Sequence, residues 1–177
     1  MRKIIPFLMA LLMLITVSNN YKEDYYIIPD ESIRIRIVPN SNSAKDQYLK
    51  RQVKTNLEIE LANDLKNSNS IETSRKIIKT NLNKYDNLVK EVLINEQIRQ
   101  KYSIDYGYHH FPEKTYKGVK YHEGEYESLL VTLGQGKGDN WWCVLFPPIC
   151  NLEENDQKLE RAEYTFYVKE MFNRYFK

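Results

Sequence analysis

The most regular hydrophobic pattern in the first part of the chain is a strict alternation from Ser32 to Val38. Isoleucines and arginines take turns along it, in the order Ile33, Arg34, Ile35, Arg36 and Ile37. Successive side chains of a β-strand point to opposite faces, so the alternation predicts a half-buried strand with the isoleucines inside. The turn-forming residues Pro39-Asn40-Ser41-Asn42 then end it.

In the next element the spacing between apolar residues changes from two residues to four. Its apolar positions are Leu49, Val53, Leu57, Leu61 and Leu65. Ser43 with Asp46 three residues later forms a capping box, so the segment predicts an amphipathic helix of about twenty residues. We interpret the charges on its other face, such as Lys50, Lys54 and Glu58, as a solvated surface rather than a binding patch.

Helical periodicity continues after a break at Asn67-Ser68-Asn69-Ser70. The apolar positions of this part are Ile71, Ile78, Leu82, Leu88, Val89, Val92 and Leu93. A weak joint from Asn81 to Asp86 leaves two interpretations open, one bent helix or two separate ones.

Strand signals return beyond Lys101. Tyr102, Ile104 and Tyr106 alternate with polar residues, and a turn-rich stretch follows from Gly107 to Gly124. Glu125 to Leu133 and Trp141 to Phe146 are rich in branched and aromatic residues, with a glycine-rich loop between them, and we predict that they pair as a hairpin. After Pro147 and Pro148 a polar linker leads to a last predicted helix.

This order of elements predicts an α+β fold, a mainly antiparallel sheet with helices packed on one face. Residues 32–177 form one domain, behind a linker at 19–31 and a targeting segment at 1–18. That segment has two cations, Arg2 and Lys3, before an apolar run of about fourteen residues, which is shorter than the roughly twenty that a membrane-spanning helix needs. A cleaved signal peptide is favoured, an uncleaved signal anchor is the alternative, and both predict export.

Charge excludes one class of function. Without Arg2 and Lys3 the chain has 24 basic and 24 acidic residues, so it lacks the basic excess by which whole domains bind nucleic acid. About 160 residues suffice for one domain with an ordinary core.

Candidate catalytic and ligand-binding motifs are few. Gly134-x-Gly136-x-Gly138 precedes a strand rather than a helix, so we interpret it as a hairpin loop and not as a phosphate cradle. His109, His110 and His122 have no zinc-ligand spacing, even with Glu123 and Glu125. We therefore expect no metal, no cofactor and no catalytic residue, although catalysis without a familiar motif stays open.

The two cysteines, Cys143 and Cys150, form an even pair in a chain predicted to be exported, and Pro147 and Pro148 can reverse the chain between them. We predict a disulfide, which would stabilise the fold by about 2.5 kcal/mol on the chain-entropy model. A redox-active pair is the alternative, but thioredoxin-like chemistry uses Cys-x-x-Cys.

Two adjacent tryptophans on one strand point to opposite faces, so they cannot both lie in a single-sided core. We predict that this end of the hairpin forms or braces the contact with a partner protein, through Trp141, Trp142, Phe146, Pro147 and Pro148. The structural alternative is that the last predicted helix, with Phe166 and Phe172, covers the outward ring.

The segment from Gly136 to Cys150 closely resembles the hallmark of the stage II sporulation protein R family. The stretches Ile33 to Val38, Asn40 to Ser43, Phe111 to Tyr116 and Gly124 to Glu127 are similar to other parts of that family, in the same order. Pro39 and Asn42 depart from it, since Ala and Asp are expected there.

The resemblance implies a signalling protein that is made in the forespore and exported into the space between forespore and mother cell. There it would activate a membrane-embedded sporulation aspartic protease, which processes the pro-form of sigma-E. The alternative is an exported hydrolase of peptide or cell-wall substrates that uses Glu123, Glu125 and the histidines.

Overall fold

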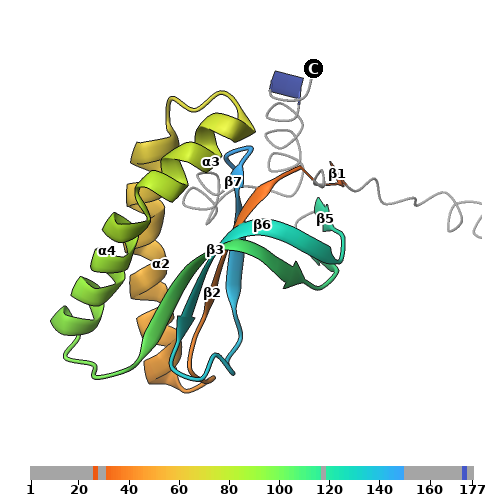
Figure 1. Cartoon of the computed structure of the whole chain (residues 1–177). Helices are drawn as coiled ribbons and strands as arrows, with labels where there is room; N and C mark the ends of the chain where they lie inside the picture. Colours follow the sequence, from red (N-terminus) through yellow and green to blue (C-terminus); the bar gives the residue numbers. More distant parts are fainter. Residues whose placement is uncertain (1–25, 28–30, 117–118, 150–172, 175–177) are drawn as a thin grey trace, which may run out of the picture.

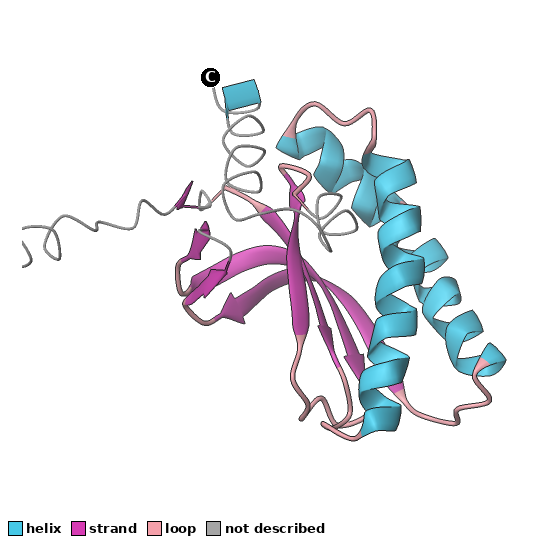
Figure 2. Cartoon of the chain, turned by 180° about the vertical axis from the view of Figure 1, so that it is seen from behind, coloured by secondary structure: helices cyan, strands magenta, loops and turns pink. Residues whose placement is uncertain are grey.

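The computed structural model describes residues 26–27, 31–116, 119–149 and 173–174, where one face of a four-stranded sheet is covered by helices (Figure 1). The helices are α2 (Ala44–Leu65), α3 (Ile71–Thr80) and α4 (Leu82–Asn95). The strands of this sheet are β2 (Ile33–Val38), β3 (Tyr102–Phe111), β6 (Gly124–Leu133) and β7 (Trp141–Phe146). The predicted α+β class is confirmed, and Figure 2 shows the helices on one side of the sheet.

The strand order is β3-β6-β2-β7, with β2 parallel to β6 and antiparallel to β7, while β3 is antiparallel to β6. The sheet is therefore mixed. The predicted hairpin of residues 125–133 with 141–146 is wrong, because β2 lies between these strands. Alternation shows which face a strand buries but does not identify its neighbour. Both faces of β2 are largely buried, which shows that the sheet has a covering layer on each side at this strand.

The core lies between the sheet and the helices. The four-residue spacing in α2 predicted its buried face correctly, and the side chains on it are Leu49, Val53, Leu57, Leu61 and Leu65. They pack with Ile33, Ile35 and Ile37 of β2, which are fully buried. The Ser43 side chain caps the helix by accepting a hydrogen bond from the N–H of Asp46 at 3.1 Å.

The question of one bent helix or two is settled in favour of two, α3 and α4, which meet at Asn81. Asp64 of α2 fixes this joint, since it accepts hydrogen bonds from Asn81 at 3.0 Å, Lys84 at 2.8 Å and Tyr85 at 2.9 Å. Burial alone would raise the pKa of Asp64, but the bonds from Lys84 and Tyr85 outweigh it and hold the pKa below its ordinary value.

A long, curved hairpin of β3 and β6 replaces much of the predicted turn-rich stretch, because β3 continues to Phe111. Beyond it a small sheet has the order β1-β5-β4, made of Tyr26–Ile27, Val119–Tyr121 and Lys114–Tyr116. In Figure 1 the hairpin curves away from the helices, so the small sheet lies on the opposite side of the main sheet. This curvature gives the outer face of β2 and β7 a second covering layer.

Several predictions concern residues outside the described ones. These are the targeting segment at 1–18, most of the linker, Cys150 and most of the last predicted helix. Within the described ranges, no helix has both the length and the apolar character that a membrane crossing requires.

Candidate protein-interaction site

Two loops that are far apart in the sequence are joined at one end of the sheet, and they fix the start of β7. The side-chain oxygen of Asn40 accepts a hydrogen bond from the N–H of Gln135 at 3.0 Å, and that of Asn42 accepts one from the N–H of Asp139 at 2.6 Å. Lys50 of α2 donates to the carbonyl oxygen of Asp139 at 2.7 Å. The first residues of β7 are therefore held against both a loop and a helix.

The glycines between β6 and β7 permit this close approach instead of forming the predicted hairpin turn. Gly134 has a φ of +61°, in the left-handed region that favours glycine. A side chain on Gly138 would overlap the carbonyl group of Ser41. Both positions therefore require glycine for the loop to follow its observed path.

Trp141 lies on the helix side of β7, at the margin of the core, and is partly buried. The ammonium group of Lys54 is 5.0 Å from its ring centroid and 3.4 Å from a carboxylate oxygen of Glu58. A cation at this distance from an indole face is attracted by the ring quadrupole.

Trp142 lies on the opposite face, as the alternation of a strand requires. Its ring centroid is 5.1 Å from that of Phe111 and 5.5 Å from that of Tyr121. The ammonium group of Lys114 is 5.3 Å from the same indole ring. The curved hairpin and β5 thus provide contacts for the outward tryptophan, whereas Phe166 and Phe172 lie outside the described residues.

Arg34 is the site residue that sequence reasoning missed, because alternation placed it on a face expected to be polar. It is fully buried, with its guanidinium carbon 3.3 Å from the ring centroid of Tyr126 and 5.2 Å from that of Phe111. Its neighbour Arg36 donates to the carbonyl oxygen of His110 at 3.1 Å. The two arginines therefore attach the curved hairpin to β2, and aromatic residues in that hairpin were the signal that could have indicated it.

The rest of the predicted contact segment lies deeper. Phe146 and Pro147 are buried, and Pro148 is half-buried. The N–H of Ile149 donates to the carbonyl oxygen of Val144 at 3.2 Å, so the turn after β7 folds back on the second half of the strand. These residues can brace a contact, while the tryptophans at the other end are nearer to the surface.

Cys143 is 3% exposed and belongs to the core on the helix side of β7. Cys150 lies outside the described residues, so the disulfide between them stays a prediction.

The three histidines are distributed over separate contacts. His109 lies between the hydroxyl of Ser128, 2.7 Å from Nδ1, and a carboxylate oxygen of Asp105, 3.0 Å from Nε2. Although this arrangement has the residue types of a catalytic triad, Ser128 is fully buried and cannot meet a substrate. The contact therefore joins β3 to β6.

The other two histidines pair with exposed acids. His110 is 3.4 Å from Glu125 and 3.7 Å from Glu123, and His122 is 4.0 Å from Glu113. Among the described side chains, no three His, Cys, Asp or Glu residues come close enough together to hold a metal ion. The expected absence of a metal stays a prediction.

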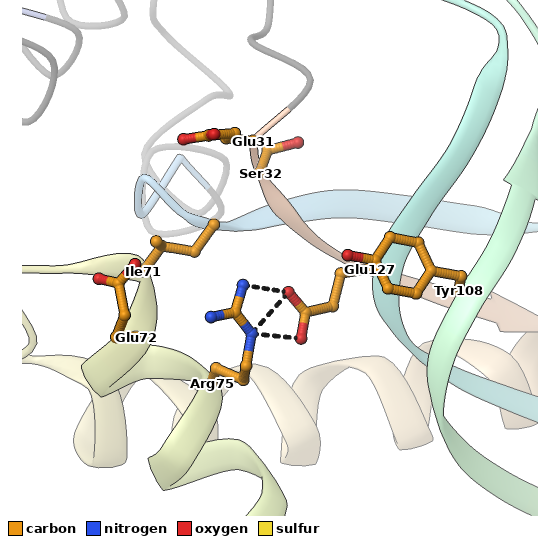
Figure 3. Close-up of a pocket in the computed structure, with 7 residues that line it drawn as sticks. All are labelled: Glu31, Ser32, Ile71, Glu72, Arg75, Tyr108 and Glu127. Atoms are coloured by element: carbon orange, nitrogen blue, oxygen red, sulfur yellow. Dashed lines mark hydrogen bonds and ion pairs between the residues drawn. The ribbon is translucent and has the colours of Figure 1, made fainter.

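A pocket of about 210 Å³ lies at the other end of the sheet, where α3 begins (Figure 3). It is lined by Glu31, Ser32, Ile71, Glu72, Arg75, Tyr108 and Glu127, and by none of the three histidines. Arg75 binds both carboxylate oxygens of Glu127 at 2.7 to 2.9 Å, and the hydroxyl of Tyr106 donates to the same carboxylate at 2.9 Å.

Electrostatics show that this pocket is organised around a stabilised ion pair. Burial would raise the pKa of Glu127, but the hydrogen bonds from Arg75 and Tyr106 outweigh it and hold the pKa below its ordinary value. The bond to Glu127 raises the pKa of Arg75 in return. Both charges are thus satisfied within the fold, and the pair ties α3 to β6.

Comparison with known proteins places these features in a family. The model of the family described as Stage II sporulation protein R (spore_II_R) matches residues 29–156, more than half of the chain. The chain belongs to the stage II sporulation protein R family. The resemblance inferred from the sequence is confirmed.

A relative in this family is the Stage II sporulation protein R of Bacillus subtilis (strain 168), to which the chain is 43% identical over 138 residues. The alignment covers 77% of this chain and 62% of the relative, so the chain spans less than two thirds of the relative's length. No solved structure matches the chain.

The stage II sporulation protein R match includes every strand of the main sheet and both joined loops. Two of the stretches that carried the resemblance, Asn40 to Ser43 and Gly136 to Asn140, are the loops that contact each other across the end of the sheet. These family-like residues therefore position the start of β7.

Proposed function

We propose that this chain is an exported sporulation signal, which activates a membrane-embedded aspartic protease of the mother cell so that pro-sigma-E is processed. Its N-terminal segment directs it from the forespore into the space between the two cells, and residues 32–177 are the signalling domain. Membership of the stage II sporulation protein R family is the observation that carries this proposal.

The geometry around β7 supports an interaction role. Both tryptophans are partly exposed at the start of β7, which is the outermost strand of the main sheet among the described residues, and each has a lysine over its ring. Tryptophan is enriched among the residues that dominate binding energy at protein interfaces. The joined loops hold this end of the strand in place before binding, which lowers the entropy lost on association.

The exported hydrolase is less well supported. An enzyme needs titratable groups that converge in a cleft, whereas His109 uses both ring nitrogens in contacts within the fold, and His110 and His122 pair with different acids at the surface. If the chain were a hydrolase, the purified protein alone would cleave peptide or peptidoglycan substrates. We expect no such turnover, and no loss of signalling on changing His110 to Ala.

The proposal is tested by expressing the chain in a non-sporulating host with a mother-cell protease of this type and pro-sigma-E. Cleavage of pro-sigma-E is expected only when all three are present. Equal cleavage without this chain would contradict the proposal.

A further inference from the structure

We infer that the outer edge of β3 binds an extended, basic segment of the partner protein, which adds to the main sheet as a further strand. The inference rests on the proposed function for the identity of the partner, and on the structure for the chemistry of the contact. This contact is additional to the one at Trp141 and Trp142, which lie on the strand at the other end of the sheet order.

β3 is the outermost strand of the main sheet on the side away from β7. It pairs with β6 over its whole length, and no other strand in the described ranges pairs with it. The N–H of Gly134 donates to the carbonyl oxygen of Lys101 at 2.7 Å, so these two residues are a hydrogen-bonded pair of the antiparallel ladder. Such pairs alternate, and the even-numbered residues of β3 therefore direct their N–H and C=O groups away from β6.

This outward row is open from Tyr102 to Tyr108. Within the described part of the chain, the outward main-chain groups of this stretch make no hydrogen bond. The row ends at His110, whose carbonyl oxygen accepts a hydrogen bond from Arg36 at 3.1 Å. Four residues thus offer main-chain donors and acceptors, namely Tyr102, Ile104, Tyr106 and Tyr108.

The edge of β3 also lacks most of the protection that exposed strands usually have. From Tyr102 to Tyr108 the strand has no proline, no lysine and no shift in its register with β6, and its one charged side chain is that of Asp105. Natural sheets use lysine, proline and bulges to prevent an edge from pairing with another chain. Their absence from this stretch favours an edge that pairs with a partner strand.

The charges beside the Tyr108 end of this edge are mostly negative. On the helix face, Tyr108 lines the pocket of Figure 3. The ion pair inside that pocket is neutral as a whole, which leaves the charges of Glu31 and Glu72 in excess. On the opposite face the side chain of Asp105 is 70% exposed. Lys79 of α3 lies at the same edge, so three carboxylates face one ammonium group, and the edge favours a basic segment.

These features define the segment that fits. Side chains of an added strand alternate between the two faces of the sheet. A lysine or arginine opposite Tyr108 would lie on the helix face, where it can stack on a ring that is 71% exposed and is attracted by Glu72. A second cation at the next position would lie on the face of Asp105, where Gly107 has no side chain to fill the space. The segment therefore has two successive cations, flanked by β-branched residues that favour an extended chain.

A direct test combines a synthetic peptide with amide hydrogen exchange of the purified chain. The probe is the fluorescein-labelled nonapeptide Thr-Val-Thr-Lys-Arg-Val-Thr-Val-Thr, and the control peptide has Glu-Asp in place of Lys-Arg. Fluorescence anisotropy should show saturable binding of the basic peptide, which weakens as salt rises. Exchange followed by NMR should slow at the four outward amides from Tyr102 to Tyr108, because their N–H groups gain partners. Equal binding of both peptides, no binding of either, or unchanged exchange at these amides would overturn the inference.

Variants localise the binding. Tyr108→Lys removes the exposed ring and adds a repelling charge, so it should weaken binding of the basic peptide about tenfold, whereas Tyr108→Phe keeps the ring and should bind like the wild type. The matched control is Ile94→Lys, which adds the same charge at an exposed apolar residue of α4. Glu72→Gln should weaken binding about twofold, and the control Glu91→Gln on α4 should not. Equal binding by Tyr108→Lys and Ile94→Lys would refute the location.

A second copy of the chain is another occupant that an open edge can accept. Analytical ultracentrifugation of the purified chain should find a monomer at the concentrations of the peptide assay. A dimer that Tyr108→Lys converts to a monomer would show that β3 pairs with itself, and would overturn the inference.

The co-expression assay separates failure of this inference from failure of the proposed function. If Tyr108→Lys is exported and unfolds at the wild-type temperature, it should support less cleavage of pro-sigma-E than Ile94→Lys. If it unfolds at a lower temperature, Glu72→Gln is compared with Glu91→Gln instead, with the same expectation. Wild-type cleavage by the β3-edge variant would overturn the basic-strand inference and leave the proposed function standing. Failure of the wild-type chain to promote cleavage would overturn the proposed function itself.

Discussion

The ion pair between Arg75 and Glu127 gives a prediction that can be worked out from the structure. The Glu127 side chain is 8% exposed and accepts hydrogen bonds from Arg75 and Tyr106, while the Arg75 side chain is 34% exposed. Changing Glu127 to Gln keeps the size of the side chain but removes its charge. Breaking a fully buried pair costs about 3 to 5 kcal/mol, and an exposed one costs less than about 1. Because solvent reaches Arg75, we expect a loss of about 2 kcal/mol at pH 7.

The sign of the pH dependence follows from the lowered pKa of Glu127 in the folded state. An unperturbed Glu titrates near about 4.3, so the contribution of the pair is fully present above that pH. It is lost as the pH falls through the lower pKa of the folded protein. The gap in stability between wild type and the Glu127→Gln variant should therefore be constant from about pH 5 upward and shrink towards pH 3.

Urea unfolding followed by circular dichroism at pH 7, 5 and 3 measures this gap as a difference in free energy of unfolding. Glu91→Gln is the matched control, since Glu91 is an exposed residue of α4 and its change should cost less than about 0.5 kcal/mol. A Glu127→Gln loss that is the same at pH 3 and pH 7, or that equals the control, would refute the reasoning.

Two substitutions and one measurement on the unchanged protein test other parts of the structure. Gly138→Ala should lower the thermal unfolding temperature, because the added methyl group overlaps the carbonyl of Ser41; an unchanged temperature would show that the loops are not tightly joined. Trp142→Ala should cost about 2 kcal/mol or more in urea unfolding, since it removes the ring between Phe111 and Tyr121; a stable variant that fails only in signalling would instead make this ring a pure contact residue. Mass spectrometry of exported protein alkylated without reduction should find Cys143 and Cys150 joined, and two alkylated thiols would disprove the disulfide.

Local patterns along the chain predicted most of the elements. The isoleucine alternation identified β2, and the four-residue spacing of leucines and Val53 identified the buried face of α2, because each pattern reflects one face that lies against the core. The joint at Asn81 could be recognised but not resolved, since the Asp64 contacts that fix it come from another helix.

Local patterns could not predict which strands are neighbours in the sheet, or that the face of β2 away from the helices is also covered. A period of two shows that Arg34 and the isoleucines face opposite sides, but not whether the second side meets water or another layer. The curvature of β3 and β6 brings Phe111 and Tyr126 over Arg34, and that curvature depends on pairings across the whole sheet.

The sequence predicted part of the geometry at Trp141 and Trp142, while their role as contact residues stays a prediction. Because Trp141 and Trp142 are adjacent on one strand, they were expected on opposite faces of the sheet. In the structure Trp141 packs against the core and Trp142 contacts Phe111 on the other face. The lysine over each ring comes from α2 or β4, which are distant from β7 in the sequence, so this part of the arrangement could not be predicted from local patterns.

The central claim, that this chain activates a sporulation protease, is tested most directly by one measurement. The fraction of pro-sigma-E cleaved is followed in a non-sporulating host that produces the mother-cell protease together with an exported form of this chain. The claim predicts cleavage that requires both the export segment and the protease. Cleavage that is unchanged when this chain is omitted, or none at all when the protease and chain are both produced, would contradict it.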